Sequence, residues 1–227
     1  MKGNPIFIAG TDTDAGKTFA ASALLHAAKE RRMTSYGLKP IAAGAVSDQH
    51  GSLKNNDALE LMKASSESLP YDQVNPIVLE PAIAPHIALE KAKRQTNVSE
   101  LAAHCRKAIE NYPADFVLIE GAGGWFVPLN MYETLADLCI ELNVRVVLVV
   151  GMKLGCISHA LLTVQAIADA GLELCGWIAN SPIEPMPYLT ENIDTLRRRI
   201  VAPCIGEIPQ LTKPEEATRH LDISSLV

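Results

Sequence analysis

The feature that most constrains this chain is the loop GTDTDAGKT at residues 10–18, which lies between an apolar run and a helical pattern. The run Ile6–Ala9 suits a strand that is buried on both faces. The stretch Thr18–Arg31 is rich in Ala and Leu, contains no Pro or Gly, and ends in basic residues, as expected of a helix with cations at its negative end. A strand, a glycine loop and a helix in this order indicate a phosphate-binding loop.

The residues at the start of the helix favour nucleotide binding. In such a loop, backbone amides hold phosphate, Lys17 reaches the terminal phosphates and the Thr18 hydroxyl coordinates Mg²⁺. Gly10 lies one residue further from Gly16-Lys17 than in the usual pattern. An ordinary turn before a helix is therefore the alternative interpretation of this stretch.

Two aspartates make the loop unusual. The carboxylates of Asp12 and Asp14 lie close to the expected position of the phosphates and should repel them. The loop therefore predicts a second ligand that favours carboxylates.

Strand-like and helical patterns alternate along the chain. The expected strands are Ile6–Ala9, Tyr36–Leu38, Phe116–Ile119, Val144–Val150, Leu174–Ile178 and Ile205–Ile208. After the first helix, the other expected helices are Asp57–Ala64, Ser99–Glu110, Thr134–Leu142, Ile157–Ala170 and Tyr188–Arg199. This alternation predicts an α/β fold with a mostly parallel sheet covered by helices on both faces, and we expect one domain over residues 1–227.

Composition excludes several classes of function. A net charge of −6 with no block of Lys and Arg to offset it argues against binding to nucleic acid or anionic lipid. The five cysteines form no metal-like spacing and no even disulfide framework, which favours a reducing compartment. The longest apolar stretch, Val146–Val150, is too short to cross a bilayer, and no signal peptide precedes the first strand. We expect a soluble, cytoplasmic protein.

Ligands of such sheets bind at the carboxyl ends of the strands, and four segments in that position carry unusual residues. We expect these segments, 39–44, 120–124, 151–156 and 180–182, to converge on one crevice with Lys17. Lys39 could neutralise a transferring phosphoryl group there, or it could be an ordinary surface lysine. Glu120 ends a buried apolar strand, where an unpartnered carboxylate would be costly, so we expect it to hold Mg²⁺ or to orient water.

Two further features permit more than one interpretation. Asp57 begins a helical pattern, and its carboxylate could be a metal ligand or simply a favourable charge at a helix start. Glycines at positions 121, 123 and 124 allow the backbone to pass close to a ligand.

A set of short motifs gives a more specific indication. They are GTDTDAGKT, GLKPIAAG, NNDALEL, PAIAPH, IEGAGGWFVPL, VVGMKLGCISHALLT, GWIAN and GEIP. In their order and spacing over nearly the whole chain, these motifs resemble the dethiobiotin synthetase family, which also accounts for the shifted glycine of the loop. The resemblance implies a P-loop NTPase-like fold and a ligase that converts 7,8-diaminopelargonate, CO₂ and ATP to dethiobiotin, ADP and phosphate.

The resemblance also implies roles for individual residues. Lys17 and Lys39 would carry the catalysis with Mg²⁺, Thr13 and Asp14 would be active-site loop residues, and the second ligand of the loop would be the diamine, whose ammonium a carboxylate stabilises. Asp14 is the better candidate for this contact, whereas Asp12 would hold the turn. The implied metal ligands are Thr18, Asp57 and Glu120. The implied ATP-binding residues are Asp14, Ala15, Gly16, Lys17, Thr18, Asn180, Pro209 and Glu215. The implied diamine-binding residues are Lys39, Ala43, Gly121, Gly123, Gly155, Cys156, Ile157 and Ser158, with positions 155–158 supplied by the partner in a homodimer.

Two departures from the family pattern concern the substrate. Ala43 stands where the family usually has serine, and Ser158 where it usually has asparagine, so a contact to the diamine could be shortened or lost. A related ATP-dependent ligase or amidase for another substrate is therefore one alternative. The other is a nucleotide-switched partitioning protein, although such switches usually carry a lysine where this chain has Asp12.

Overall fold

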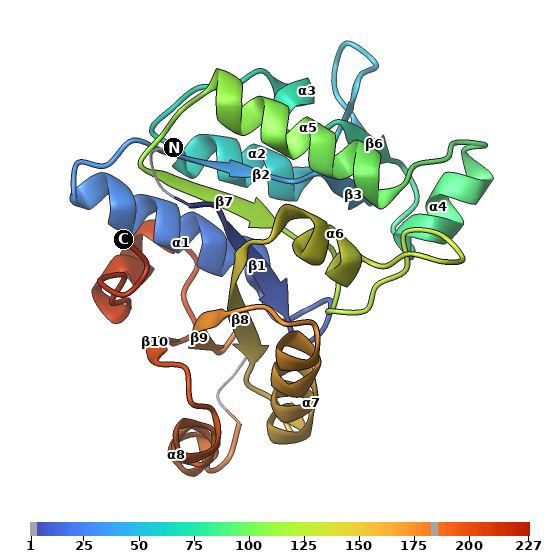
Figure 1. Cartoon of the computed structure of the whole chain (residues 1–227). Coiled ribbons are helices and arrows are strands. Elements are labelled where there is room, and N and C mark those ends of the chain that lie inside the picture. Colours follow the sequence, from blue (N-terminus) through green and yellow to red (C-terminus); the bar gives the residue numbers. More distant parts are fainter. Residues whose placement is uncertain (1–3, 183–185) are drawn as a thin grey trace.

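A parallel sheet with helices on both faces forms the centre of the computed structural model, which describes residues 4–182 and 186–227 (Figure 1). The strand order in this six-stranded sheet is β10-β9-β8-β1-β7-β2, and every neighbouring pair is parallel. Its strands are β1 (Ile6–Gly10), β2 (Ser35–Leu38), β7 (Phe116–Glu120), β8 (Arg145–Gly151), β9 (Leu174–Asn180) and β10 (Cys204–Ile208). All six expected strands occur, and the predicted α/β class with a parallel sheet is confirmed.

The expected helices also form, and each end lies within one residue of the expected position. They are α1 (Lys17–Glu30), α2 (Asn56–Ala64), α5 (Val98–Asn111), α6 (Leu135–Leu142), α7 (Cys156–Asp169) and α8 (Leu189–Arg199). Side-chain caps fix three of these starts. Asn55 accepts a hydrogen bond from the Ala58 N–H, Asn97 accepts one from the Glu100 N–H, and Thr134 forms a capping box with Asp137.

Several short elements were not expected from the sequence. They are β3 (Ile41–Ala43), β4 (Val46–Ser47), β5 (Leu53–Lys54), α3 (Tyr71–Val74), β6 (Ile77–Leu79), α4 (Pro85–Lys91) and the 3₁₀ helix η1 (Pro214–His220). Strands β3 and β6 pair in parallel in a small separate sheet. These elements are too short to show a period of their own, and β3 pairs with a segment that is distant in the chain.

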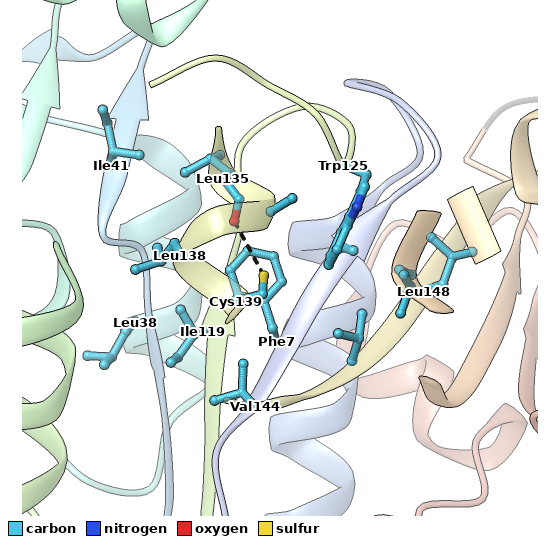
Figure 2. Packing of buried hydrophobic residues seen from close by; sticks show 14 of the residues in the cluster. Phe7, Leu38, Ile41, Ile119, Trp125, Leu135, Leu138, Cys139, Val144 and Leu148 are labelled. Carbon is cyan, nitrogen blue, oxygen red and sulfur yellow. Dashed lines mark hydrogen bonds between the residues drawn. The ribbon is translucent and has the colours of Figure 1, made fainter. Parts of the chain in front are cut away.

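Successive side chains of the central strands point to opposite faces of the sheet, so the core forms two layers. In β1, Ile6 and Ile8 pack with α1 and η1, whereas Phe7 and Ala9 pack on the opposite face with α5, α6, α7 and α8. Figure 2 shows part of this second layer, in which Phe7 lies among side chains of α6 and β7. Burial of the central strands on both faces explains why they read as continuous apolar runs.

The strand order also determines where a ligand can bind. From β1 the chain proceeds to β2 toward one edge of the sheet, and β8, β9 and β10 lie toward the other edge. The carboxyl end of β1 is therefore at a topological switch point, where a crevice opens outside the sheet. Among the described residues, no helix has the length and hydropathy that a bilayer crossing requires.

Candidate active site

The phosphate loop joins β1 to α1 and is held from behind by neighbouring strands. Gly16, at the start of α1, has a φ of 81°, in the left-handed region that glycine adopts without strain. The Asn180 side-chain amide donates to the Ala15 carbonyl at 2.8 Å, and the Thr11 N–H donates to the Val149 carbonyl at 3.0 Å. These contacts fix the loop on the ends of β8 and β9.

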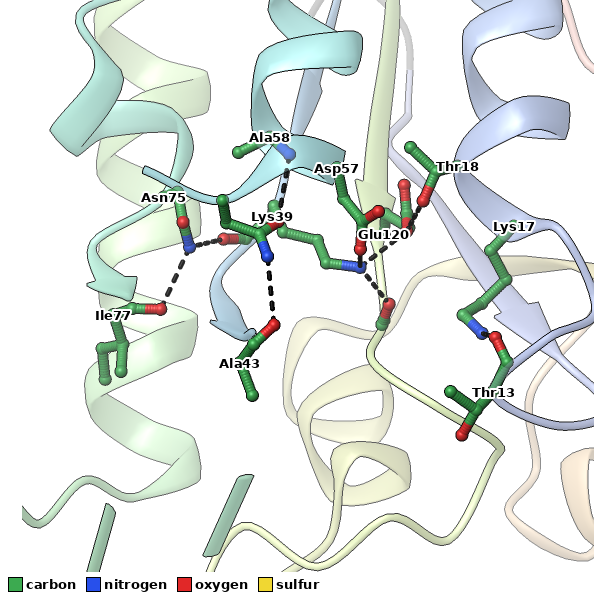
Figure 3. Close-up of polar contacts among 12 residues, drawn as sticks. Thr13, Lys17, Thr18, Lys39, Ala43, Asp57, Ala58, Asn75, Ile77 and Glu120 are labelled. Atoms are coloured by element: carbon green, nitrogen blue, oxygen red, sulfur yellow. Dashed lines mark hydrogen bonds and ion pairs between the residues drawn. The ribbon is translucent and has the colours of Figure 1, made fainter. Parts of the chain in front are cut away.

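Lys17 reaches back over this loop. Its Nζ atom donates to the backbone carbonyl of Asp12 at 2.9 Å. It also donates to the carbonyl of Thr13 at 3.4 Å (Figure 3). The side chain is only 5% exposed, and burial together with the nearby Lys39 charge lowers the pKa of Lys17 to about 8. Neutral carbonyls compensate a buried ammonium only in part, so an anionic phosphate is the stronger partner for this group.

A buried polar cluster lies next to Lys17, at the ends of β2 and β7. The Lys39 Nζ atom lies 2.6 Å from Glu120 Oε1 and 3.1 Å from Asp57 Oδ2, and it also donates to the Gly121 carbonyl at 2.9 Å (Figure 3). The Thr18 hydroxyl donates to Glu120 Oε1 at 2.7 Å. Lys39 and Glu120 thus lie together next to Lys17, as expected, and Asp57 joins them; Lys39 is a buried rather than a surface lysine.

The charges in this cluster stabilise one another. Burial lowers the pKa of Lys39, but the charges of Glu120 and Asp57 outweigh it, so the net pKa of Lys39 is raised. Burial also opposes ionisation of Asp57, yet the Lys39 ammonium holds its pKa below the ordinary value. Lys39 and Asp57 are therefore both charged at neutral pH.

The oxygen atoms of the cluster suit a hard divalent cation. Glu120 is fully buried, and its Oε2 atom has no hydrogen-bond partner among the described residues. With the Thr18 hydroxyl and the Asp57 carboxylate, this orphaned oxygen forms a donor set that is appropriate for Mg²⁺, which also keeps waters or phosphate oxygens as ligands. The three residues therefore fit the metal expected from the sequence.

The two loop aspartates face different surroundings. The Asp12 carboxylate forms an ion pair with Lys153, which follows β8, whereas Asp14 and Thr13 line the cavity described next. Asp12 thus holds the loop against β8, and Asp14 is available to a ligand in the cavity.

A cavity of about 750 Å³ opens beside Lys17 and the polar cluster. All seven implied catalytic and metal residues line it, namely Thr13, Asp14, Lys17, Thr18, Lys39, Asp57 and Glu120. Three implied ATP- or diamine-binding residues, Gly16, Ala43 and Gly123, line it as well. One wall is mostly apolar and consists of Ala82, Ile83, Ala84, Pro85, Val127 and Pro128. The sequence alone predicts no role for this wall, although the motif PAIAPH contains most of it.

The remaining implied residues lie elsewhere on the chain. Positions 155–158 at the start of α7 do not line this cavity, so only part of the expected convergence occurs within one chain. Asn180 lies behind the phosphate loop, and its amide donates to Ala15. Pro209 lines a separate cavity of about 590 Å³ beside α8, and Glu215 is exposed on η1.

Known proteins of similar sequence cover this chain almost completely. A family model described as an AAA domain matches residues 4–218. ATP-dependent dethiobiotin synthetase BioD of Cellvibrio japonicus is 52% identical over 229 residues, which cover 100% of this chain and 99% of that protein. The proteins of the same name from Pseudomonas paraeruginosa and Aeromonas salmonicida are 46% and 45% identical, with 97% of this chain and 96% and 98% of those proteins covered.

Solved structures of low sequence identity share the fold. The septum site-determining protein MinD of Pyrococcus horikoshii, solved with Mg-ADP, aligns with a TM-score of 0.57 at 16% identity and covers 95% of this chain. That alignment includes 92% of the MinD chain. Chloroplast FtsY of Physcomitrella patens gives a TM-score of 0.57 at 15% identity, with 100% of this chain and 64% of that chain covered. At these identities the likeness concerns the fold alone.

Proposed function

The chain belongs to the ATP-dependent dethiobiotin synthetase family, and on that basis we propose that the cavity beside Lys17 converts 7,8-diaminopelargonate, CO₂ and ATP to dethiobiotin, ADP and phosphate. The observation that carries this proposal is the buried cluster of Lys39, Glu120 and Asp57 next to the phosphate-loop lysine. Phosphoryl transfer depends mostly on positioning and charge stabilisation, and both are present here.

The cavity has separate regions for the phosphates of ATP and for the aliphatic chain of the diamine. Lys17 and Thr18 belong to the loop where the phosphates of ATP would bind, and Lys39 lines the same cavity as these residues and the apolar wall. The aliphatic chain of the diamine suits the wall around Ile83 and Pro85, since burial of methylene groups is favourable there. The reacting amines would then lie beside Lys39.

Mg²⁺ is proposed as the metal of this site, held by Thr18, Asp57 and Glu120. The bound ion would neutralise part of the charge on the ATP phosphates and on the transferring group. This chain's own contribution is to hold the three oxygen donors close to the buried Lys39.

The steps of the reaction use groups that are already in place. One amine of the diamine takes up CO₂ and releases a proton, which forms a carbamate. A carbamate oxygen attacks the γ-phosphorus of ATP and ADP leaves, which gives a carbamic-phosphoric anhydride. The second amine attacks the carbonyl carbon of that anhydride, phosphate leaves, and the ureido ring closes. Lys17 and Lys39 stabilise the negative charge that develops on the transferring phosphoryl oxygens.

Asp14 is proposed to face the amine end of the diamine. Its carboxylate lines the cavity, whereas that of Asp12 is paired with Lys153. A carboxylate favours a nearby ammonium, so Asp14 would help to bind the protonated amine before CO₂ uptake. This contact would explain why an anionic residue is tolerated within a phosphate loop.

A homodimer is proposed to complete the substrate site. Leu154, just before α7, and Leu162, on α7, are 93% and 68% exposed, as expected of residues at a subunit contact. The first turn of the same helix follows Gly155 and contains Cys156, Ile157 and Ser158. Its N–H groups are suited to bind the substrate carboxylate of the partner's site. Mixing equal amounts of two inactive variants, Lys17→Gln and one with a bulky residue at Gly155, should restore about a quarter of the wild-type activity, because half of the randomly formed dimers are mixed and each of these contains one intact site out of two. No recovery after confirmed subunit exchange would place both halves of the site on one chain.

Turnover with the expected substrates tests the proposed function directly. The enzyme is incubated with diaminopelargonate, bicarbonate and MgATP, and dethiobiotin is detected by mass together with ADP release. We expect diamine-dependent ADP release from the wild type and none from Lys17→Gln with the fold retained. ADP release that does not depend on the diamine would contradict the proposal and favour a nucleotide switch.

The state of the cysteines bears on the cellular location. All five cysteines, Cys105, Cys139, Cys156, Cys175 and Cys204, are free thiols. Free thiols are typical of a reducing compartment, so we propose a cytoplasmic enzyme.

A further inference from the structure

We infer that Tyr71 is a positioning residue that sets the spacing between Lys39 and Asp57 through a buried chain of hydrogen bonds. Tyr71 is the first residue of α3, and it is not among the residues that line the cavity. The inference rests on the proposed roles of Lys39 and Asp57.

One end of the chain holds the backbone of Lys39. The Asn75 side chain, whose residue is 2% exposed, donates from Nδ2 to the Lys39 carbonyl at 2.7 Å and to the Ile77 carbonyl at 3.0 Å (Figure 3). The Lys39 N–H in turn donates to the Val74 carbonyl at 2.8 Å. Residues at the end of α3 thus fix where the lysine leaves β2.

The other end holds the start of the helix that carries Asp57. Asn55 is 5% exposed and caps α2, because its Oδ1 atom accepts from the Ala58 N–H at 3.3 Å. Its Nδ2 atom donates to the Ala43 carbonyl at 3.1 Å, so the cap is also tied to β3. Asp57 is two residues further on, in the first turn, and its position follows that of the cap.

The Tyr71 hydroxyl joins these two ends. It accepts from the Asn55 N–H at 2.7 Å and donates to Asn75 Oδ1 at 2.9 Å. A group that both donates and accepts is required at this point, since one neighbour is a donor and the other an acceptor. Burial raises the pKa of Tyr71 despite the hydrogen bond from Asn55, so the hydroxyl keeps the proton that it donates.

The ring of Tyr71 is held independently of its hydroxyl. Lys54 Nζ lies 3.7 Å from the ring centroid, in a cation–π contact that phenylalanine would also make. Tyr71→Phe therefore removes both hydrogen bonds of the hydroxyl and retains the packing of the ring. Without the hydroxyl, the cap of α2 loses its link to Asn75, and Asp57 is free to move relative to Lys39 and Glu120, which it must match within a fraction of an ångström.

The test measures metal binding rather than activity alone. Mn²⁺ is titrated into the enzyme with ATP and followed by electron paramagnetic resonance, in the wild type and in Tyr71→Phe. We expect the Mn²⁺ dissociation constant to rise about tenfold, as for other residues that orient metal ligands, and kcat to fall several-fold. Tyr112→Phe is the matched control, since no hydrogen bond of its hydroxyl occurs within the described residues, and we expect it to bind Mn²⁺ like the wild type.

Asp57→Asn separates this inference from the proposed function. If Tyr71 acts through Asp57, then Tyr71→Phe should change the Mn²⁺ dissociation constant by less than about twofold in the Asp57→Asn background. A lower melting temperature with unchanged Mn²⁺ binding in Tyr71→Phe would mean a structural role only and would overturn the inference. If Asp57→Asn itself leaves Mn²⁺ binding unchanged, the proposed metal role of Asp57 fails first. Should Tyr71→Phe not fold, Asn75→Ser interrupts the same chain from the Lys39 side, and normal Mn²⁺ binding by that variant would equally overturn the inference.

Discussion

Binding of ATP to this chain should take up most of a proton per site at alkaline pH. The group responsible is Lys17, which is buried and, within the part of the chain that the structure describes, donates only to loop carbonyls. Burial and the Lys39 charge lower its pKa from 10.5 to about 8. At pH 8.5 such an amine is roughly one quarter protonated, and the ATP phosphates, which are fully ionised there, would restore the ammonium. The expected uptake is about 0.7 proton at pH 8.5 and about 0.1 proton at pH 7.

Isothermal titration calorimetry measures this uptake. ATP is titrated with Mg²⁺ but without diamine, in two buffers of different ionisation enthalpy, at pH 7 and at pH 8.5. The difference in observed binding enthalpy between the buffers, divided by the difference in ionisation enthalpy, gives the number of protons. A binding enthalpy that is independent of the buffer at pH 8.5 would refute the argument, because Lys17 would then be fully charged before ATP binds.

The same pKa predicts how stability depends on pH. Because the pKa of Lys17 is lower in the folded than in the unfolded chain, the folded chain binds fewer protons between pH 8 and pH 10.5. The cost of the buried ammonium is fully present below pH 8 and is relieved as the pH rises through this window. A pKa change from 10.5 to about 8 corresponds to roughly 3 kcal/mol at 1.36 kcal/mol per pKa unit. The free energy of unfolding in urea is measured for the wild type and for Lys17→Met between pH 8 and pH 10.5. The wild-type value should rise relative to that of the variant by up to roughly 3 kcal/mol over this range. A difference that stays constant with pH would contradict the lowered pKa of Lys17.

Two further substitutions test the cluster and the loop. Lys39→Met should lower the free energy of unfolding by about 3–5 kcal/mol, because it leaves the buried Glu120 carboxylate without its ammonium, and adding Glu120→Gln should recover most of that loss in urea unfolding but no activity. Gly151→Ala should raise the KM for ATP at least about tenfold in steady-state assays, since its Cβ would lie 2.9 Å from the Ala15 Cα atom and displace the loop. Gly124→Ala is its control, because the added Cβ would make only ordinary contacts with the same loop.

The sequence alone determined the sheet, the main helices and the phosphate loop. Apolar runs such as Phe116–Ile119 lie on a strand buried on both faces, and they can be recognised in the sequence without knowing which strands pair with them. The loop at positions 10–18 is likewise local, because its glycines, lysine and threonine act on phosphate from one continuous stretch. Of the candidate site, the sequence identified Lys17, Thr18, Lys39, Asp57 and Glu120 from their places at strand ends and helix starts, and the structure brings these five together.

Only the tertiary structure decided how the charges are partnered. The pairing of Lys39 with Glu120 joins residues 81 positions apart, and the pairing of Asp12 with Lys153 separates the two loop aspartates into one that holds the loop and one that faces the cavity. The role of Tyr71 was not visible in the sequence, because a hydroxyl that links a helix cap to the end of a strand has no local pattern. Hydrophobic periodicity is a property of neighbouring residues, whereas an ion pair or a buried hydrogen bond depends on which distant segments the crossover connections bring within about 3 Å of one another.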